Sequence, residues 1–402
     1  MTEPLYDAIV VGGGPAGATA AADLAGRGRS VLLLDRAGRI KPCGGAVPPI
    51  LIREFAIPDT LMVARAQGAR IVAPSAAEAD MPIEGGYVGM VDREQFDEWL
   101  RDRAAGLGAE RQDGRFERVS RDPDGVARVH WAPKGDGPER SARTRTVIGA
   151  DGAKSAVARQ CVPGADHVKY VFAYHEIVRA PAASREYDPT RCDIYYQGPL
   201  SPDFYAWVFP HGDTMSIGTG SARKGFGLRP AVAKLRAQAG LDGLETVRRE
   251  GAPIPLRPMK RWDNGRDVVL AGDAAGVVAP ASGEGIYYAM LGGRLAADAV
   301  EALCATGDAR ALRTARKRFM KAHGRIFTVL GLMQWFWYAS DKRRETFVKM
   351  CRDKDVQRLT WDSYMNKRIA RRDPMAHVRV FFKDMAQLVG LPRLRALAKS
   401  RA

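Results

Sequence analysis

The chain has 402 residues, of which 46% are hydrophobic and 27% charged, a composition that is typical of globular proteins and excludes wholesale disorder. This length predicts roughly two or three structural units. Five cysteines without a CxxC or Cys/His spacing argue against a disulfide framework and against structural zinc, so we expect a reducing compartment and no metal site.

Positive charge is concentrated toward the C-terminus. The net charge is +16, and residues 342–402 contain 17 Lys and Arg against 6 Asp and Glu. A basic segment can bind nucleic acid, an anionic membrane or an acidic substrate, and composition does not choose among them. The chain has no run of 18 apolar residues, and residues 1–4 lack a basic region. We therefore expect a cytoplasmic protein without a transmembrane helix, signal peptide or transit peptide.

The first 35 residues predict a strand–helix–strand unit. Residues 8–11 are apolar and form the first expected strand, residues 18–25 form an alanine-rich helix, and residues 31–34 form a second strand that ends at Asp35. The turn before the helix has the Gly-x-Gly-x-x-Gly spacing of dinucleotide-binding proteins. This order of elements is the context that the spacing requires.

Each glycine of the turn has a physical role. Gly12 permits the sharp turn, Gly14 lets a pyrophosphate approach the backbone, and Gly17 lets the helix pack on the strand. Asp35 is placed to accept hydrogen bonds from a ribose, and its charge disfavours a 2′-phosphate, so the cofactor is FAD or NAD rather than NADP. The expected cofactor-binding residues here are Gly12, Gly14, Pro15, Ala16, Gly17, Asp35 and Arg36.

The next distinctive segment is the Pro/Gly-rich loop 41–45, which contains Cys43. Such a loop is an unusual place for a core thiol. Three roles remain open for Cys43: a proton donor beside a bound cofactor, a packing residue, or a redox-sensitive bystander. Further along, residues 92–108 predict a helix and residues 146–152 a short buried strand that ends in a turn.

Residues 165–260 have the β-branched and aromatic segments, broken by Pro, Gly and Asp, that predict an antiparallel sheet. Tyr205, Trp207 and Phe209 alternate along one expected strand, where they line an apolar cavity or belong to the sheet core. His175 and His211 fall in the same region and lack partners at metal spacing, so we expect structural histidines.

The buried-strand pattern returns at residues 267–273 and is followed by a helix from about residue 285. Residues 326–338 are apolar and end in the Trp/Phe/Tyr-rich segment 334–338. This run is too short to span a bilayer, and it predicts either a buried helix or a helix at a membrane interface.

Four segments in order resemble the FAD signatures of flavoprotein hydroxylase-type folds. Besides the glycine turn, they are residues 91–97 with Arg93, residues 149–152 with Ser155, and residues 271–276 followed by 282–285. The resemblance implies that Asp273 binds the ribityl chain of FAD and that Arg93 reaches the flavin. The further cofactor-binding residues that it implies are Gly44, Gly45, Arg93, Asp273, Gly276, Gly283, Gly285 and Ile286.

The loop 41–45, the run 205–210 and the following residues 216–220 resemble geranylgeranyl reductases, and residues 347–351 and 361–365 are similar to the branch that acts on chlorophyll or bacteriochlorophyll. This resemblance implies NADPH-driven, FAD-dependent reduction of a geranylgeranyl chain to phytyl, on the pigment ester or on geranylgeranyl diphosphate. It implies that Tyr205, Trp207 and Phe209 bind the substrate, and Cys43, whose role stays open among the three given above, is the candidate catalytic residue. NADPH would bind transiently at a place that the sequence does not reveal.

The expected fold is α/β: an FAD-binding Rossmann-like domain of the flavoprotein hydroxylase type, with an inserted antiparallel β-sheet substrate domain and a helical C-terminus. The expected divisions are 1–72, 92–163 and 262–300 for FAD, 73–91 and 164–261 for the substrate sheet, and 301–402 for the basic helical region. The alternative enzyme is a flavin monooxygenase or halogenase of the same fold. Nucleic-acid binding is disfavoured because no recognisable nucleic-acid motif accompanies the basic segment. We expect peripheral contact with an anionic photosynthetic or inner membrane instead.

Overall fold

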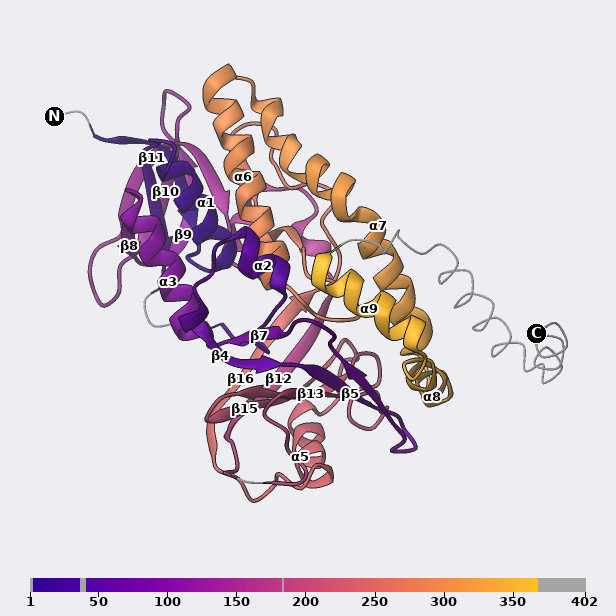
Figure 1. Ribbon diagram of the computed structural model, residues 1–402. Coiled ribbons are helices and arrows are strands. Elements are labelled where there is room, and N and C mark those ends of the chain that lie inside the picture. The colour runs from indigo at the N-terminus through magenta and orange to yellow at the C-terminus, as the bar shows by residue number, and fades with distance from the viewer. Residues whose placement is uncertain (1–2, 37–40, 183, 368–402) are drawn as a thin grey trace, which may run out of the picture.

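The first sheet is built around the N-terminal strand–helix–strand unit of the computed structural model, which describes residues 3–36, 41–182 and 184–367 (Figure 1). In this described part, the strand order is β8-β2-β1-β11-β10-β9, with β17 paired to β11. The pairs among β8, β2, β1, β11 and β17 are parallel, whereas β10 and β9 are antiparallel additions. The strands are β1 Leu5–Val11, β2 Val31–Asp35, β8 Glu110–Asp113, β9 Arg115–Arg121, β10 Ala127–Ala132, β11 Arg140–Gly149 and β17 Val268–Leu270.

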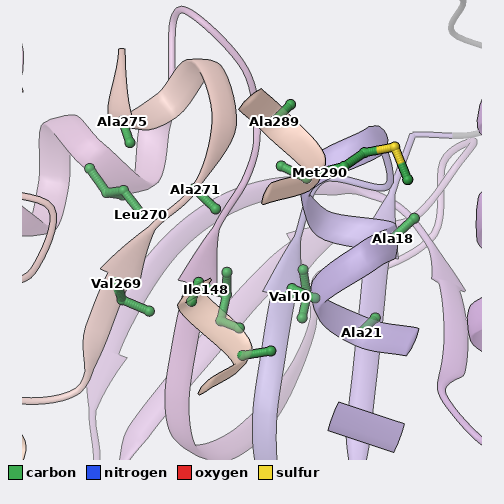
Figure 2. Packing of buried hydrophobic residues seen from close by; sticks show 14 of the residues in the cluster. Val10, Ala18, Ala21, Ile148, Val269, Leu270, Ala271, Ala275, Ala289 and Met290 are labelled. Carbon is green, nitrogen blue, oxygen red and sulfur yellow. The ribbon is translucent and has the colours of Figure 1, made fainter. Parts of the chain in front are cut away.

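Helices α1 (Pro15–Ala25) and α6 (Ile286–Thr306) pack against each other through small residues, and α3 (Arg93–Gly106) also packs on α1. A Cβ placed on Gly293 of α6 would lie 2.1 Å from the carbonyl oxygen of Ala16, so only glycine permits this approach. Figure 2 shows the result, with small α1 side chains and α6 residues beside the buried strand residues Val10 and Ile148.

The second sheet has the order β16-β12-β15-β14-β13-β5-β6 in the described residues. All of its neighbouring strands are antiparallel except β5 and β13, which are parallel. The strands are β5 Gly68–Val72, β6 Glu78–Pro82, β12 Tyr170–Arg179, β13 Arg191–Tyr195, β14 Ala206–His211, β15 Thr214–Ser221 and β16 Thr246–Pro255. From the sequence we expected residues 68–72 to belong to the FAD-binding domain, together with the first sheet. The structure pairs them with β13 instead, a partner more than 100 residues away that no local pattern reveals.

The two faces of β14 have different neighbours. Ala206 and Val208 pack toward α5 (Leu228–Gln238), whereas Trp207 and Phe209, with Tyr205 just before the strand, join a separate apolar cluster. The period-two alternation expected for Tyr205, Trp207 and Phe209 is confirmed. A small third sheet has the order β3-β7-β4; its strands are β3 Ala46–Val47, β7 Val88–Val91 and β4 Met62–Ala66.

The C-terminal part of the described chain is helical. The long helix α7 (Arg313–Trp337) lies beside α6, and α9 (Lys354–Asn366) returns to contact α2 (Pro49–Glu54) (Figure 1). Among the described helices, none is long and apolar enough to cross a membrane. Residues 368–402, which carry much of the basic segment, lie outside the described residues. The remaining helices are α4 Ala156–Cys161, α8 Asp341–Met350 and the short 3-10 turns η1 Asp59–Leu61, η2 Ala165–His167, η3 Gly272–Ala275 and η4 Ala309–Leu312.

Candidate active site

The glycine turn forms one end of a cleft. Gly12 has φ +106°, and a Cβ on it would lie 2.3 Å from the carbonyl oxygen of Ala150, so a side chain is excluded there. A Cβ on Gly17 would lie 1.8 Å from the carbonyl oxygen of Gly12. Gly14, by contrast, precedes helix α1 and would point a Cβ into open space. The helix N-terminus and the space before Gly14 are the arrangement that accommodates a pyrophosphate.

This cleft has a volume of about 410 Å³ and extends from the glycine turn past Asp35 and Arg36 to Arg93 and Asp273. Asp35, at the end of β2, is 3.1 Å from the guanidinium of Arg101. Burial raises the pKa of Asp35 above its usual value, while the amides of Gly13 and Arg36 and the charge of Arg101 oppose that rise. Sequence reasoning missed Arg101, because a cation on a distant helix gives no local signal.

The middle of the cleft holds two ion pairs. Arg93, at the start of α3, donates two hydrogen bonds to Asp97, at 2.8 and 2.6 Å, and is 5% exposed. Burial lowers its pKa, but the charge of Asp97 and then Cys43 raise it above the ordinary value overall. Asp273 is buried and lies 2.5 Å from the Lys41 ammonium. Lys41, the first residue of the loop 41–45, is therefore a cleft residue whose pairing with Asp273 the sequence did not reveal.

Beyond Arg93 the cleft continues into an inner pocket of about 120 Å³. The two cavities share Pro15, Lys41, Arg93 and Asp273, which shows that they adjoin. The inner pocket contains most of the remaining predicted residues: Cys43, Gly44, Gly45, Tyr205, Trp207, Phe209, Gly283, Gly285 and Ile286. Gly276 does not line either cavity. It has φ +81° and lies in the turn that ends η3. A Cβ there would lie 2.2 Å from the carbonyl oxygen of Arg257, so the turn requires glycine.

One wall of the inner pocket is aromatic. Tyr205 and Trp207 pack edge to face at 5.8 Å, and Trp207 lies 6.1 Å from Phe209. The Tyr205 hydroxyl donates a hydrogen bond of 2.5 Å to the carbonyl oxygen of Ser282, and burial raises the pKa of Tyr205. Tyr205 is therefore a poor proton donor. A wall of this kind suits a hydrocarbon and keeps water away from it.

A chain of buried hydrogen bonds holds Trp207. Its indole N–H donates to the Ser216 hydroxyl oxygen at 3.0 Å, and Ser216 is 2.9 Å from Nδ1 of His175. Nε2 of His175 lies 3.0 Å from Glu250. Both ring nitrogens of His175 thus have partners, as expected for a structural histidine, but the ring also lines the inner pocket. The buried Ser216 hydroxyl thus links the Trp207 indole to His175, and the partly buried Glu250 holds the other side of the imidazole.

We expect Trp207→Ala to change substrate use more than FAD content, because it removes part of the pocket wall. Ser216→Ala should have a smaller effect of the same kind, since it leaves the indole N–H and His175 without their shared partner. The measurement is the mass spectrum of the products and the FAD content of each variant. Val208→Ala, on the opposite face of β14, is the control. Equal losses of FAD, folding and activity in all three variants would make Trp207 an ordinary core residue.

The cavity system fits FAD. The space at Gly14 and the N-terminus of α1 suit a pyrophosphate, the Asp35 carboxylate suits a ribose hydroxyl, and the cleft continues past Arg93 and Asp273 to the mouth of the inner pocket. Residues 52–318 match the FAD-binding domain family, and residues 10–50 match the NAD(P)-binding Rossmann-like domain family. The fold and site therefore define an FAD-dependent oxidoreductase.

Relatives of known activity narrow the class. The geranylgeranyl diphosphate reductase of Rhodobacter capsulatus is 57% identical to this chain, over 96% of the chain and 98% of the relative. The chloroplastic enzyme of Oryza sativa with the same name is 37% identical, over 96% of this chain and 87% of the relative. The chain belongs to the geranylgeranyl diphosphate reductase family.

Solved structures show how widely the fold is shared. A geranylgeranyl bacteriochlorophyll reductase-like protein of Thermoplasma acidophilum has a TM-score of 0.79 at 21% identity, covering 92% of this chain and 99% of its own. A flavin-dependent brominase has a TM-score of 0.73 at 17% identity, and the match covers 95% of this chain and 100% of the brominase. Such distant likeness establishes the fold alone. The monooxygenase or halogenase alternative shares that fold, but the relatives at high identity favour the reductase.

Proposed function

We propose that this enzyme saturates carbon–carbon double bonds of a geranylgeranyl chain, in successive steps that end at phytyl. The substrate is either geranylgeranyl diphosphate or the geranylgeranyl ester of chlorophyll or bacteriochlorophyll, with NADPH as the electron donor. The observation that most supports this proposal is the inner pocket, which has an aromatic wall, adjoins the FAD cleft and is lined by the Cys43 thiol. The names of the close relatives support the same substrate class.

In this proposal each residue of the pocket has a defined task. FAD held in the cleft at Gly14, Asp35 and Asp273 would, when bound and reduced, supply the hydride for one alkene carbon. Tyr205, Trp207 and Phe209 orient the prenyl chain and exclude water, and Cys43 gives a proton to the other carbon. Arg93 is beside Cys43 and would stabilise the thiolate that remains. An unconjugated alkene accepts hydride poorly, so a proton donor held in a dry pocket is required.

Incubation of the purified, FAD-loaded protein with NADPH and each substrate under anaerobic conditions tests the function. Mass spectrometry should find stepwise gains of two hydrogens, up to three times. Absence of any gain with both substrates would contradict the proposal. Oxygen-dependent hydroxylation or halogenation of an added aromatic compound would favour the alternative enzyme class.

Cys43→Ala should slow alkene reduction about a hundredfold or more, the range that positioned proton transfer contributes. Flavin reduction by NADPH should change little, because that step needs no proton from Cys43. Single-turnover product formation after flavin reduction separates the two steps. Cys304→Ala, on α6 and away from both cavities, is the control. An unchanged single-turnover rate in Cys43→Ala would remove Cys43 from the mechanism.

We also propose that the enzyme works in the cytoplasm, in peripheral contact with the photosynthetic or inner membrane, where its prenyl substrate partitions. Helix α7 supports this with an exposed apolar stripe at helical spacing: Val329, Leu332 and Trp335 are 46%, 60% and 73% exposed. From the sequence, residues 326–338 were expected to form either a buried helix or a helix at a membrane interface. Helix α7 has one face of each kind, since Phe327 and Trp337 are buried on the other side. Residues 342–402 add the positive charge that anionic lipids attract.

Binding to vesicles should rise with the anionic lipid fraction and fall with salt, and Leu332→Ser/Trp335→Ser should weaken it at all salt concentrations. The basic residues contribute roughly 1 kcal/mol each near such a surface, and the apolar stripe adds insertion that salt does not screen. Co-sedimentation measures both effects. Val247→Ser is the control, because Val247 is 47% exposed on β16, away from α7. Equal binding by the double variant and the control would contradict a role for α7.

A further inference from the structure

A third cleft adjoins the flavin site from the outer side of the second sheet. It has a volume of about 560 Å³ and is formed by β12, β16, the start of α5 and Lys154. β12, β16 and α5 lie together in the lower half of Figure 1, whereas Lys154 comes from the segment between β11 and α4. Ala252 and Pro253 of β16 line this cleft, the FAD cleft and the inner pocket alike. A ligand in the β12–α5 cleft would therefore lie next to bound FAD.

The lining of the β12–α5 cleft combines aromatic rings with positive charge. Phe172 lies near the start of β12 and is 46% exposed, with the Lys154 ammonium 5.6 Å from its ring centre. The Arg229 guanidinium lies 5.7 Å from the centre of the Tyr174 ring. Among the described residues that line the cleft, these two cations are the charged groups and no carboxylate is present. Such a lining favours a ligand that has both a flat ring and negative charge.

One carboxylate that contacts this lining, Glu176, is already neutralised. Glu176 accepts a hydrogen bond from the Tyr174 hydroxyl at 2.9 Å and is paired with Arg236 at 2.6 Å and Arg249 at 3.4 Å. Its charge is therefore not left to repel an anion in the cleft. The electrostatic environment of Phe172 and Tyr174 is positive on balance.

The reaction needs a place for a second dinucleotide. The sequence contains one Gly-x-Gly-x-x-Gly segment, residues 12–17, and its cleft takes FAD. A prenyl chain needs an enclosed apolar wall, which the inner pocket provides, whereas the β12–α5 cleft opens to solvent and is cationic at its edge. A ligand that arrives, reacts and leaves in each catalytic cycle requires such an open site.

We propose that the β12–α5 cleft is the transient binding site of the nicotinamide dinucleotide that reduces FAD. This inference rests on the proposed function, since it assumes a nicotinamide donor. Lys154 and Arg229 bind the phosphates, Phe172 stacks on a ring of the nucleotide, and the nicotinamide reaches past the edge formed by Ala252 and Pro253 into contact with the flavin. One hydride moves from C4 of the dihydronicotinamide to the flavin, so the nicotinamide is oxidised and the flavin is reduced by two electrons. The oxidised dinucleotide then leaves by the open side.

Titration calorimetry of the FAD-loaded protein with NADP⁺ tests the site without catalysis. Lys154→Met and Arg229→Met should each weaken binding about tenfold, as expected for the loss of a charge-assisted contact. Lys224→Met, an exposed cation on the preceding loop that does not line the cleft, should bind as the natural protein does. Anaerobic bleaching of the flavin by NADPH, compared in each variant with bleaching by dithionite, should slow in the two cleft variants alone.

The outcomes are distinct. Unchanged NADP⁺ affinity in both cleft variants would overturn the proposal. Unchanged NADP⁺ affinity with weakened binding of geranylgeranyl diphosphate would also overturn it and assign the cleft to the substrate head group. A natural protein that binds no NADP⁺ and is not bleached by NADPH, yet saturates the prenyl chain with dithionite, would instead refute the donor in the proposed function. Selective weakening in the cleft variants, with intact dithionite bleaching, would support it.

Discussion

Gly14→Val is expected to abolish FAD binding while the fold remains intact. Gly14 has φ −74° and ψ −175°, a conformation that any residue adopts, so valine introduces no backbone strain. A Cβ at this position meets no protein atom within 4 Å and points into the cleft. The side chain would occupy the space of the pyrophosphate, where the backbone and the N-terminus of α1 must approach the ligand closely.

Flavin absorbance after reconstitution and the thermal unfolding of the FAD-free protein together check this result. The variant should show no bound flavin, and its FAD-free unfolding temperature should match that of the natural FAD-free protein. Gly17→Val is the matched comparison, since its Cβ would lie 1.8 Å from the Gly12 carbonyl oxygen and should impair folding itself. Stoichiometric FAD in Gly14→Val would show that the pyrophosphate lies elsewhere.

Local patterns predicted the parts of the site that depend on neighbours in the sequence. The glycine turn, the two strands around it and the alternation of Tyr205, Trp207 and Phe209 each follow from spacing that a few residues reveal. The family of the chain followed from motifs in order. Such signals are local because turns, helix starts and strand faces are determined by residues a few positions apart in the sequence.

Partners far apart in the sequence could not be predicted in this way. Asp273 was expected to contact FAD, but nothing local indicated that Lys41 would lie 2.5 Å from it. His175 was expected to be structural, yet only the fold brings it to Ser216 and to the wall of the pocket. The parallel pairing of β5 with β13 has the same origin. Long-range pairing depends on the whole topology, and opposite charges are too common in the sequence to identify their partners.

The second large effect is expected from Lys367→Met, which should lower the free energy of unfolding by about 3–5 kcal/mol. Lys367 follows α9, and its ammonium lies 2.5 Å from Glu284, with both side chains at most 5% exposed. Glu284 is between Gly283 and Gly285 in the loop that lines the inner pocket. Its second oxygen, Oε1, has no hydrogen-bond partner among the described residues. Loss of the lysine would leave a buried carboxylate without compensation.

The double variant Lys367→Met/Glu284→Gln should regain most of the lost stability, because it removes the unpaired charge rather than one partner of the pair. Lys349→Met, an exposed position on α8, should change stability by no more than about 0.5 kcal/mol. Denaturant unfolding of the FAD-free protein measures all three. A single variant as stable as the natural protein, or a double variant no better than the single one, would contradict the prediction. Because this pair joins the end of α9 to the loop beside the flavin, prenyl reduction should decline in Lys367→Met even where the protein remains folded.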